Sequence, residues 1–294
     1  MNVIRHFAWA AGAAVTMLLS GQASAALLAY DGFESSAAPV DVDGLAEGQN
    51  WVEAGTYQAW NSDAGAGQVQ VVEKSLAAAG ISGGTQAVRV TNTGSDLDVG
   101  LARQFEYTAD APDNDTIYLS FLIQLEPGFT SSQFINVHVT DDANAFGNAS
   151  DALGVGFRNA AGNPFFARVG SSSDETVNSS INAVGGETFF VVGKFSKDGG
   201  SSTYNRTDLF VFDEQAALPT AEPGVTAATA IDSAPGIETL KFVNVRFFGL
   251  GSEHTLYLDE FRIGTDWAAV IPEPGTAALL GAGVLLALRR RRRR

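Results

Sequence analysis

Carboxylates are the first residues in this chain whose chemistry can be considered, because Asp and Glu together number 33. A retaining glycosidase needs two carboxyl groups about 5–5.5 Å apart. On one strand this requires acidic residues at alternate positions, as in Glu-x-Asp-x-x-Glu, since neighbouring side chains point to opposite faces. The chain contains no such string. We interpret the adjacent pair Asp259–Glu260 as a strand-end or bulge feature and not as a catalytic pair.

Other catalytic residue types have even less support. The chain has three histidines and no cysteine, which excludes thiol catalysis and disulfides. Neither a Gly-x-Ser-x-Gly nor a His-Glu-x-x-His string occurs. His138 belongs to the polar face of an alternating segment, which predicts an exposed histidine or one at the rim of a sheet. We therefore expect no catalytic residue and a protein that is not an enzyme.

Two stretches rich in Asp and Asn could bind calcium, which prefers clustered oxygen ligands. One is "DVDG" at residues 41–44. The other is "TDDANAFGNASD" at 140–151, with Asp141, Asp142 and Asn144 as candidate ligands. Neither completes an EF-hand loop, and such turns commonly hydrogen-bond to their own backbone. Calcium is the only cofactor that the sequence suggests.

Three aromatic residues, Trp51, Tyr57 and Trp60, lie close together in "NWVEAGTYQAW". Their flat rings suit stacking against sugar rings, which predicts a carbohydrate-binding site. The alternative is that the same rings fill the core at an edge of a β-sandwich, since large apolar side chains are usually buried.

The segments that must position these residues alternate between apolar and polar with a period of two. In "TIYLSFLIQLE", every second residue from Ile117 to Leu125 is apolar and lies on one face. Runs of this kind start at residues 68, 86, 98, 116, 134, 152, 164, 187, 207, 241 and 254, and Gly, Asn, Asp and Ser separate them. The pattern predicts an all-β domain over residues 26–271, built as a sandwich of two antiparallel sheets.

Turn residues add detail to this prediction. Gly162–Asn163 and Asp198–Gly200 predict hairpin turns. "SLAAAG" at 75–80 predicts a short helical turn, and 215–236 predicts a long surface connection. In "TLYLDEFRIG" the apolar residues change face midway, which predicts a β-bulge near Asp259–Glu260.

The N-terminus has the three parts of a secretory signal peptide. A short basic segment is followed by the apolar residues 7–19 and by a small-residue cleavage motif with Ala23 and Ala25. We expect cleavage after Ala25, so residues 1–25 do not belong to the folded domain.

The C-terminus combines the motif Pro272, Glu273 and Pro274 with an uncharged segment and a basic end. Residues 276–288 would span about 20 Å as a helix, less than a bilayer core of about 30 Å. This predicts a single short transmembrane helix that anchors the chain weakly. The positive-inside rule keeps the basic end in the cytoplasm. This membrane-stop cluster consists of Arg289, Arg290, Arg291, Arg292, Arg293 and Arg294.

These C-terminal features resemble a PEP-CTERM sorting signal, here residues 272–294. The resemblance implies an exported protein of an exopolysaccharide-producing Gram-negative bacterium, with an exosortase-type membrane protease as the partner that processes its tail. It also implies transient membrane anchoring: an inner-membrane-tethered precursor comes first, followed by a product at the cell surface or outside the cell.

The body of the chain carries a second resemblance. The opening "LLAYDGFESS", followed by "GLAEGQNW", and the closing "LYLDEFRIGTDWAAV" resemble PEP-CTERM proteins with a concanavalin A-like, laminin-G-like jelly-roll β-sandwich. The resemblance implies that an early strand with Tyr30, Gly32 and Phe33 pairs near a late strand over 259–264. This fold hosts glycosidases, lectins and passive modules, so it does not decide the function.

Charge excludes nucleic acid as a partner. Residues 26–271 contain 11 basic and 32 acidic residues, a formal charge of −21, which does not suit phosphate binding. We expect an exported, non-catalytic structural or interaction protein of the cell surface or extracellular matrix. One alternative is a carbohydrate-binding module for extracellular polysaccharide. Another is a divergent glycoside-active enzyme of the same fold.

Overall fold

Every alternating run forms a strand in the computed structural model of the chain, which confirms the all-β prediction. The structure describes residues 26–35, 38–52, 59–62, 68–91, 97–105, 116–127, 134–141, 152–158, 162–170, 176–232, 237–250 and 254–272. Within these ranges the one helix is the four-residue α1 (Trp267–Val270). β-Branched and aromatic residues favour strands because their side chains pack well on a pleated, half-buried surface.

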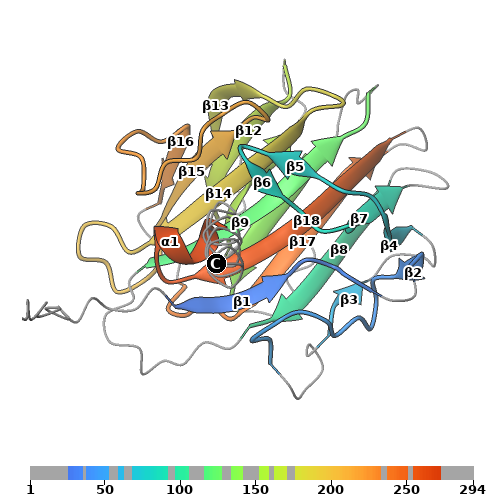
Figure 1. Cartoon of the computed structure of the whole chain (residues 1–294). Coiled ribbons are helices and arrows are strands. Elements are labelled where there is room, and N and C mark those ends of the chain that lie inside the picture. Colours follow the sequence, from blue (N-terminus) through green and yellow to red (C-terminus); the bar gives the residue numbers. More distant parts are fainter. Residues whose placement is uncertain are drawn as a thin grey trace, which may run out of the picture.

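Most strands belong to two antiparallel sheets that pack face to face, as predicted (Figure 1). The larger sheet contains, in spatial order, β16 (Ala228–Ile231), β15 (Arg206–Phe212), β14 (Thr188–Ser196), β9 (Thr116–Leu125), β18 (Thr255–Gly264), β7 (Gln86–Thr91), β4 (Val69–Glu73) and β2 (Val40–Asp41), with β1 (Leu27–Asp31) also paired to β18. The smaller sheet contains, in spatial order, β13 (Thr176–Asn182), β12 (Pro164–Val169), β11 (Leu153–Arg158), β10 (Phe134–Thr140), β17 (Phe242–Leu250), β8 (Leu97–Gln104) and β3 (Asn61–Ser62). A separate hairpin pairs β5 (Ala77–Ala78) with β6 (Ile81–Ser82).

An apolar core fills the space between the two sheets. Alternate residues of the central strands, such as Phe121 of β9 and Val137 of β10, are fully buried in it. The rings of Phe121 and Phe261 stack with their centroids 5.5 Å apart. Burying one such side chain contributes about 1.5–3 kcal/mol. The core therefore holds the sandwich together in a chain that has no cysteine.

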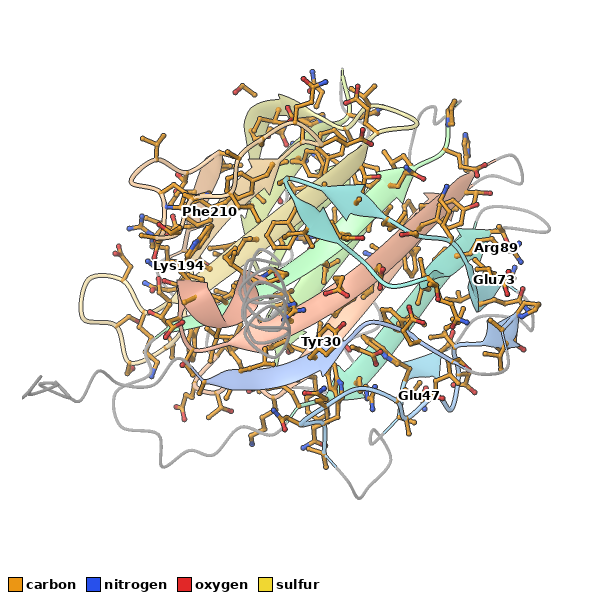
Figure 2. The ribbon with its side chains drawn as sticks, in the orientation of Figure 1. Tyr30, Glu47, Glu73, Arg89, Lys194 and Phe210 are labelled. Carbon is orange, nitrogen blue, oxygen red and sulfur yellow. The ribbon has the colours of Figure 1, made fainter. Side chains whose placement is uncertain are left out.

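The first and last strands pair with each other, as the resemblance implied. Tyr30 of β1 lies opposite Arg262 of β18, and its hydroxyl donates a 2.8 Å hydrogen bond to Glu260 Oε1. Figure 2 labels Tyr30 on β1. The register of β18 against β9 shifts between Asp259 and Arg262, which confirms the predicted bulge. Glu260 adopts a positive φ of 55° within it.

A second apolar cluster covers part of the outer face of the nine-stranded sheet. Phe210 of β15 packs there with Trp267 of α1 and with Leu76, next to β5. Both α1 and the β5–β6 hairpin lie in front of this sheet (Figures 1 and 2). The hairpin occupies the segment predicted as a helical turn, so that prediction is wrong. Ala79 and Gly80 both have positive φ, which is the geometry of a tight hairpin turn.

The predicted turns and the predicted surface connection have different outcomes. Gly162 and Asn163 have φ of 95° and 54° between β11 and β12. Gly199 and Gly200 have positive φ between β14 and β15. Both hairpin turns are thus confirmed. The segment predicted as a surface connection instead contains β16, which pairs with β15. Its four residues alternate too briefly to be recognised by pattern.

The segments predicted at the two ends of the chain lie outside the described residues. These are the signal peptide with Ala23 and Ala25, and the region from Glu273 and Pro274 through the arginines 289–294. Pro272 is the last residue described. In the described part of the chain, α1 has four residues, and no helix there reaches the length and apolarity needed to cross a membrane.

Candidate functional site

The outer face of the seven-stranded sheet carries a cluster of polar side chains. Asn136 and His138 come from β10, Asn244 and Arg246 from β17, and Arg168 from β12. Their apolar neighbours in each strand belong to the core between the sheets. Because successive side chains of a strand point to opposite faces, the polar residues point away from that core. We call these five residues the outer-face site.

Strand register brings these side chains together across the sheet. His138 lies opposite Asn244 on one side and opposite Gly154 on the other. Gly154 in turn lies opposite Arg168. Directly opposed residues of antiparallel strands have Cβ atoms about 4.5–5.5 Å apart. Asn244 and His138 are therefore neighbours, and only a glycine separates His138 from Arg168.

Two glycines of β11 let neighbouring atoms of the site approach the strand closely. Gly154 lies opposite His138, and Gly156 lies opposite Asn136. A Cβ atom at position 154 would collide with the carboxamide of Asn136, with the Cγ atom only 2.9 Å away. A Cβ atom at position 156 would collide with the carbonyl oxygen of Ile135. The Asn136 side chain therefore leans over Gly154, where any larger residue would displace it.

Two carboxamides of the site are buried without the hydrogen bonds that would satisfy them. Asn244 is 0% exposed, and neither its Nδ2 nor its Oδ1 has a partner in the described structure. Asn136 is 5% exposed, and its Oδ1 has no partner. Leaving such a group unsatisfied costs about 1–3 kcal/mol, and folded proteins contain few of them. Two such groups in adjacent strands single out this part of the sheet as a candidate site.

His138 is the titratable residue at the centre of the site. It is 1% exposed, so the prediction of an exposed or rim histidine is wrong. The reason is that β10 is a central strand with neighbours on both sides. The Nδ2 of Asn136 lies 3.3 Å from Nδ1 of His138. A half-turn of the carboxamide exchanges its nitrogen and oxygen, which lets Nδ1–H of His138 donate to the oxygen.

Aromatic side chains border the site along the strands. Phe134 and Phe166 stack with their centroids 5.2 Å apart. The guanidinium of Arg168 lies 5.7 Å from the centre of the Phe134 ring, and that of Arg246 lies 5.2 Å from the centre of Phe248. Phe248 is 43% exposed, so this end of the face is open to solvent. An exposed ring beside buried amides suits a sugar, which has an apolar face and a polar edge.

Positive charge gathers on this face, although the chain has a formal net charge of −15. Arg158, which lies opposite Phe134, joins Arg168 and Arg246 there. Asp98 of β8 holds the register position opposite Phe248, at the edge of this group of arginines. The three arginines attract anions. The described side chains of this face do not provide the carboxylate pair that glycoside hydrolysis needs.

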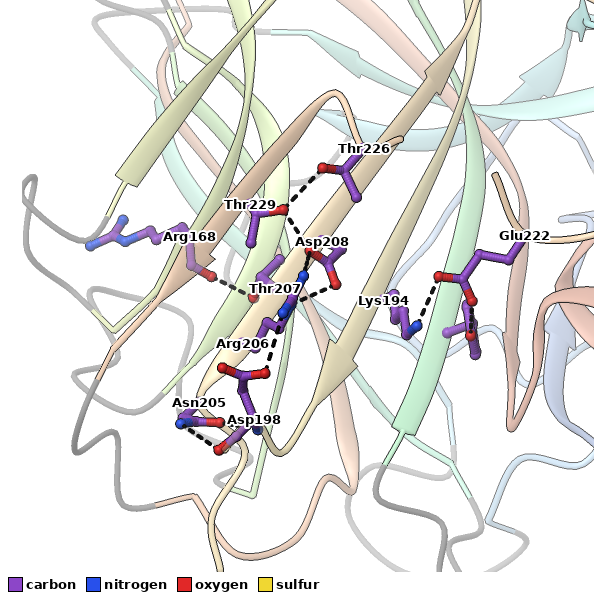
Figure 3. Close-up of polar contacts among 11 residues, drawn as sticks. Arg168, Lys194, Asp198, Asn205, Arg206, Thr207, Asp208, Glu222, Thr226 and Thr229 are labelled. Atoms are coloured by element: carbon purple, nitrogen blue, oxygen red, sulfur yellow. Dashed lines mark hydrogen bonds and ion pairs between the residues drawn. The ribbon is translucent and has the colours of Figure 1, made fainter. Parts of the chain in front are cut away.

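The main chain beneath Arg168 is fixed to the other sheet. The hydroxyl of Thr207 on β15 donates a 2.8 Å hydrogen bond to the carbonyl oxygen of Arg168. Figure 3 shows the Arg168 guanidinium extending away from this bond. Next to Thr207, the Nε and Nη2 atoms of Arg206 donate to Asp208 at 2.9 and 3.1 Å. The Thr207 hydrogen bond fixes the main chain from which the Arg168 side chain starts.

The tryptophans predicted to bind carbohydrate lie in the core instead. Trp51 and Trp60 are both buried, with ring centroids 5.7 Å apart. Neither indole offers a face to a sugar, so the core-filling alternative describes both. They enclose a buried ion pair: Trp60 Nε1 donates to Asp31 Oδ2 at 2.8 Å, and Arg103 pairs with the same oxygen at 2.5 Å. Tyr57 lies outside the described residues.

The predicted calcium site at 140–151 lies mostly outside the described residues. Asp141 is exposed at the end of β10, while Asp142 and Asn144 lie outside the described residues. In the other stretch, Asp43 accepts a 2.9 Å hydrogen bond from the backbone of Ser62. Across the described ranges, no group of three or more His, Asp or Glu side chains is placed to hold a metal ion.

The outer-face site itself was not found from the sequence, although a signal for it is present. Two strands carry Asn-Val followed by a basic residue, at 136–138 and at 244–246. A third strand carries glycine at two alternate positions, 154 and 156. Single-strand patterns do not reveal that these three strands are neighbours, because pairing and register depend on the whole sheet.

Comparison with known proteins gives structural similarities only. No protein-family model and no curated protein matches the chain. The chain is similar to the marine PL-14 alginate lyase from Aplysia kurodai, with 11% identity and a TM-score of 0.45 over 67% of this chain and 86% of that one. It is similar to the endo-β-1,4-glucuronan lyase from the fungus Trichoderma reesei, with 13% identity and a TM-score of 0.43 over 74% and 99%. It is also similar to the T. cruzi calreticulin globular domain, with 12% identity and a TM-score of 0.40 over 71% and 87%.

The expectation that the protein is not an enzyme is contradicted, since two of these three structures are polysaccharide lyases. With TM-scores below 0.5, they assign no activity to this chain. The structure itself shows a sandwich of two antiparallel sheets. The choice of substrate and reaction depends on the residues of the outer-face site.

Proposed function

We propose that this protein cleaves an acidic polysaccharide by β-elimination at the outer-face site. The observation that carries the proposal is the pair of buried, unsatisfied carboxamides of Asn136 and Asn244. They lie beside His138 and near Arg168 and Arg246. Guanidinium and amide groups bind carboxylates, and histidine is suited to act as a general base near neutral pH.

Each part of the reaction has a residue for it. Asn244 and Arg246 bind the carboxylate of one uronate unit and stabilise the charge that develops there. His138 acts as the base that removes the proton from C5, next to that carboxylate. The electron pair forms a C4=C5 double bond, and the bond from C4 to the glycosidic oxygen breaks. The leaving oxygen takes a proton from the histidine or from water, so no other reactant is consumed.

The exposed ring of Phe248 gives the polysaccharide a second contact with the protein. In this proposal a neighbouring sugar stacks on Phe248 while Arg158 and Arg246 attract the anionic backbone of the polymer. A neutral polysaccharide would use the ring but not the arginines. We therefore expect the protein to prefer uronate-rich chains, and to prefer them most at low salt.

The test is to incubate the purified protein with alginate and with glucuronan, the polymers named for the two lyases above. The ultraviolet absorbance of the new double bond reports elimination. His138→Ala should lower the rate at least about 100-fold, the usual contribution of a general base. His254→Ala, at the other buried histidine, is the matched control. Binding without any new double bond, at any pH, would refute the elimination step, and no binding would refute the site.

We also propose that the sandwich is of the concanavalin A-like, laminin-G-like kind and that the protein is exported through its PEP-CTERM signal. The pairing of β1 with β18 supports the first part. The motif at 272–274 and the arginines at 289–294 support the second. An intact-mass measurement of protein recovered from the cell surface should find residues 1–25 and the arginines removed. A mass equal to the full chain would contradict this route.

A further inference from the structure

Asp259 forms a second unusual polar group, on the nine-stranded sheet and away from the outer-face site. It lies at the bulge of β18 and is 0% exposed. Its Oδ1 accepts a 2.7 Å hydrogen bond from the backbone of Glu260, whereas its Oδ2 has no partner in the described structure. One oxygen of a fully buried carboxyl group is therefore left unsatisfied.

The charged form of Asp259 is unfavourable as it stands. Burial is the largest cause of a rise in its pKa to about 9, and the charge of Glu260 adds to it. A cation bound at Oδ2 would give this oxygen a partner and compensate the charge.

The surroundings of Asp259 contain more carboxylates than cations. The negative charges of Asp31, Glu34 and Glu260 all act on it. Two of these carboxylates already have an arginine of their own: Arg103 pairs with Asp31, and Arg262 pairs with Glu260 at 2.9 Å. Among the ion pairs of the described residues, none involves Asp259 or Glu34.

Oxygen atoms converge at the two glycines that follow β6. Asp259 Oδ2 lies so close to Gly83 that a Cβ atom there would collide with it, and the carbonyl oxygen of Leu76 would lie 3.2 Å from the same atom. Glu34 Oε1 approaches Gly84 in the same way. Only glycine at both positions lets these two carboxylates come so near the same piece of backbone.

Hydrogen bonds from Thr85 and Gln86 hold the Glu34 carboxylate in place. Its Oε1 accepts hydrogen bonds from the backbone of Thr85 at 2.5 Å and of Gln86 at 3.2 Å. Its Oε2 accepts one from the Thr85 hydroxyl at 3.0 Å. A carboxylate has about four acceptor positions, so one remains for a metal ion. The side chain is exposed, which gives an ion a way in from solvent.

We propose that Asp259 and Glu34 bind a calcium ion between the bulge of β18, the segment after β1 and the connection after β6. Calcium takes six to eight oxygen ligands and accepts carboxylates, main-chain carbonyls and water together. The Leu76 carbonyl is the nearest candidate for a main-chain ligand. The site is distinct from the one predicted at Asp141, Asp142 and Asn144. The ion would hold together parts of the chain that are far apart in sequence.

The test is the melting temperature of the chelator-treated protein with and without calcium. At about one hundred times its dissociation constant, calcium should raise the melting temperature by roughly 5–10 °C for a domain of this size. Asp259→Asn keeps the shape of the side chain and should abolish the shift. Glu34→Gln, at an exposed position, should weaken calcium binding at least about tenfold. Glu187→Gln and Asp141→Asn each remove one exposed carboxylate and should leave the shift unchanged.

Three results would overturn the proposal. The first is a melting temperature that does not respond to calcium. The second is a calcium shift that survives in both Asp259→Asn and Glu34→Gln. The third is loss of the shift in Asp141→Asn, which would place the ion at the loop after β10. If Asp259→Asn does not fold, Glu34→Gln alone decides. The polymer assay is independent, because this site lies on the other sheet.

Discussion

Replacement of Arg103 by methionine tests how the two sheets are joined across the core. Arg103 belongs to β8 in one sheet, and its partner Asp31 belongs to β1 in the other. Both side chains are buried. The guanidinium also donates to the carbonyl oxygen of Glu47 at 2.6 Å and lies 4.4 Å from the centre of the Trp51 ring. Methionine keeps the length of the side chain but leaves the Asp31 carboxylate without a counter-charge.

The expected loss is large compared with the stability of a typical domain. Removing one partner of a buried ion pair costs about 3–5 kcal/mol, out of a total stability of about 5–15 kcal/mol. For a domain of this size, about 1 kcal/mol corresponds to roughly 2–4 °C. The melting temperature of Arg103→Met should therefore fall by roughly 6–20 °C.

The loss should also depend on pH. Burial is the main cause that raises the pKa of Asp31 to about 6, and the charge of Arg103 opposes this rise. Without Arg103 the folded-state pKa rises further above the unfolded value of about 4. A carboxyl group with a raised folded-state pKa destabilises the fold as pH rises between these two values. The difference in the free energy of unfolding between the wild type and Arg103→Met should therefore be larger above about pH 6. It should be smaller at about pH 5, where Asp31 is mostly neutral in both proteins.

Urea denaturation at about pH 5 and about pH 8 measures both effects. Arg158→Met is the control, because this half-buried arginine bonds to Asn178 and not to a carboxylate. It should lose less than about 1 kcal/mol. If Arg103→Met lost no more than this control at about pH 8, the ion pair would not join the sheets. If its loss did not change with pH, the account of Asp31 would be wrong.

Three other substitutions test the glycines of β11, a hairpin turn and the charge of the outer-face site. Gly154→Ala displaces the Asn136 carboxamide and should weaken polymer binding about tenfold in calorimetry, whereas Gly224→Ala, with nothing within 4 Å, should not. Asn163→Val places a β-branched residue at a φ of 54° and should lower the free energy of unfolding by about 1–2 kcal/mol; equal stability in urea would contradict the turn. Arg246→Gln should weaken binding at low salt and reduce its salt dependence, and an unchanged salt dependence would remove Arg246 from the contact.

Much of the fold could be predicted because a sandwich repeats one simple rule. Strands such as β9 and β17 are long enough for alternation to be clear, and turn residues such as Gly162 separate them. The bulge at Asp259–Glu260 was visible because the apolar residues change face. The rule fails for strands of two to four residues, such as β5 and β16, where tertiary contacts decide the conformation.

The candidate site could not be predicted from single strands. His138 and Asn244 are more than one hundred residues apart in sequence, and only the register of β10 against β17 makes them neighbours. Burial was also misjudged, because a polar face was assumed to be exposed. Trp51 and Trp60 were close together in the sequence, and proximity alone suggested a binding site. The structure instead places both rings around the Asp31 ion pair.

Mass spectrometry of the products that the purified protein forms from alginate tests the central claim most directly. Elimination leaves products with a C4=C5 double bond, each lighter by one water than the products of hydrolysis. We expect these unsaturated ends from the wild type and from His254→Ala, and their loss in His138→Ala. Saturated ends, or the same yield of unsaturated ends from His138→Ala, would contradict the assignment of the reaction to the outer-face site.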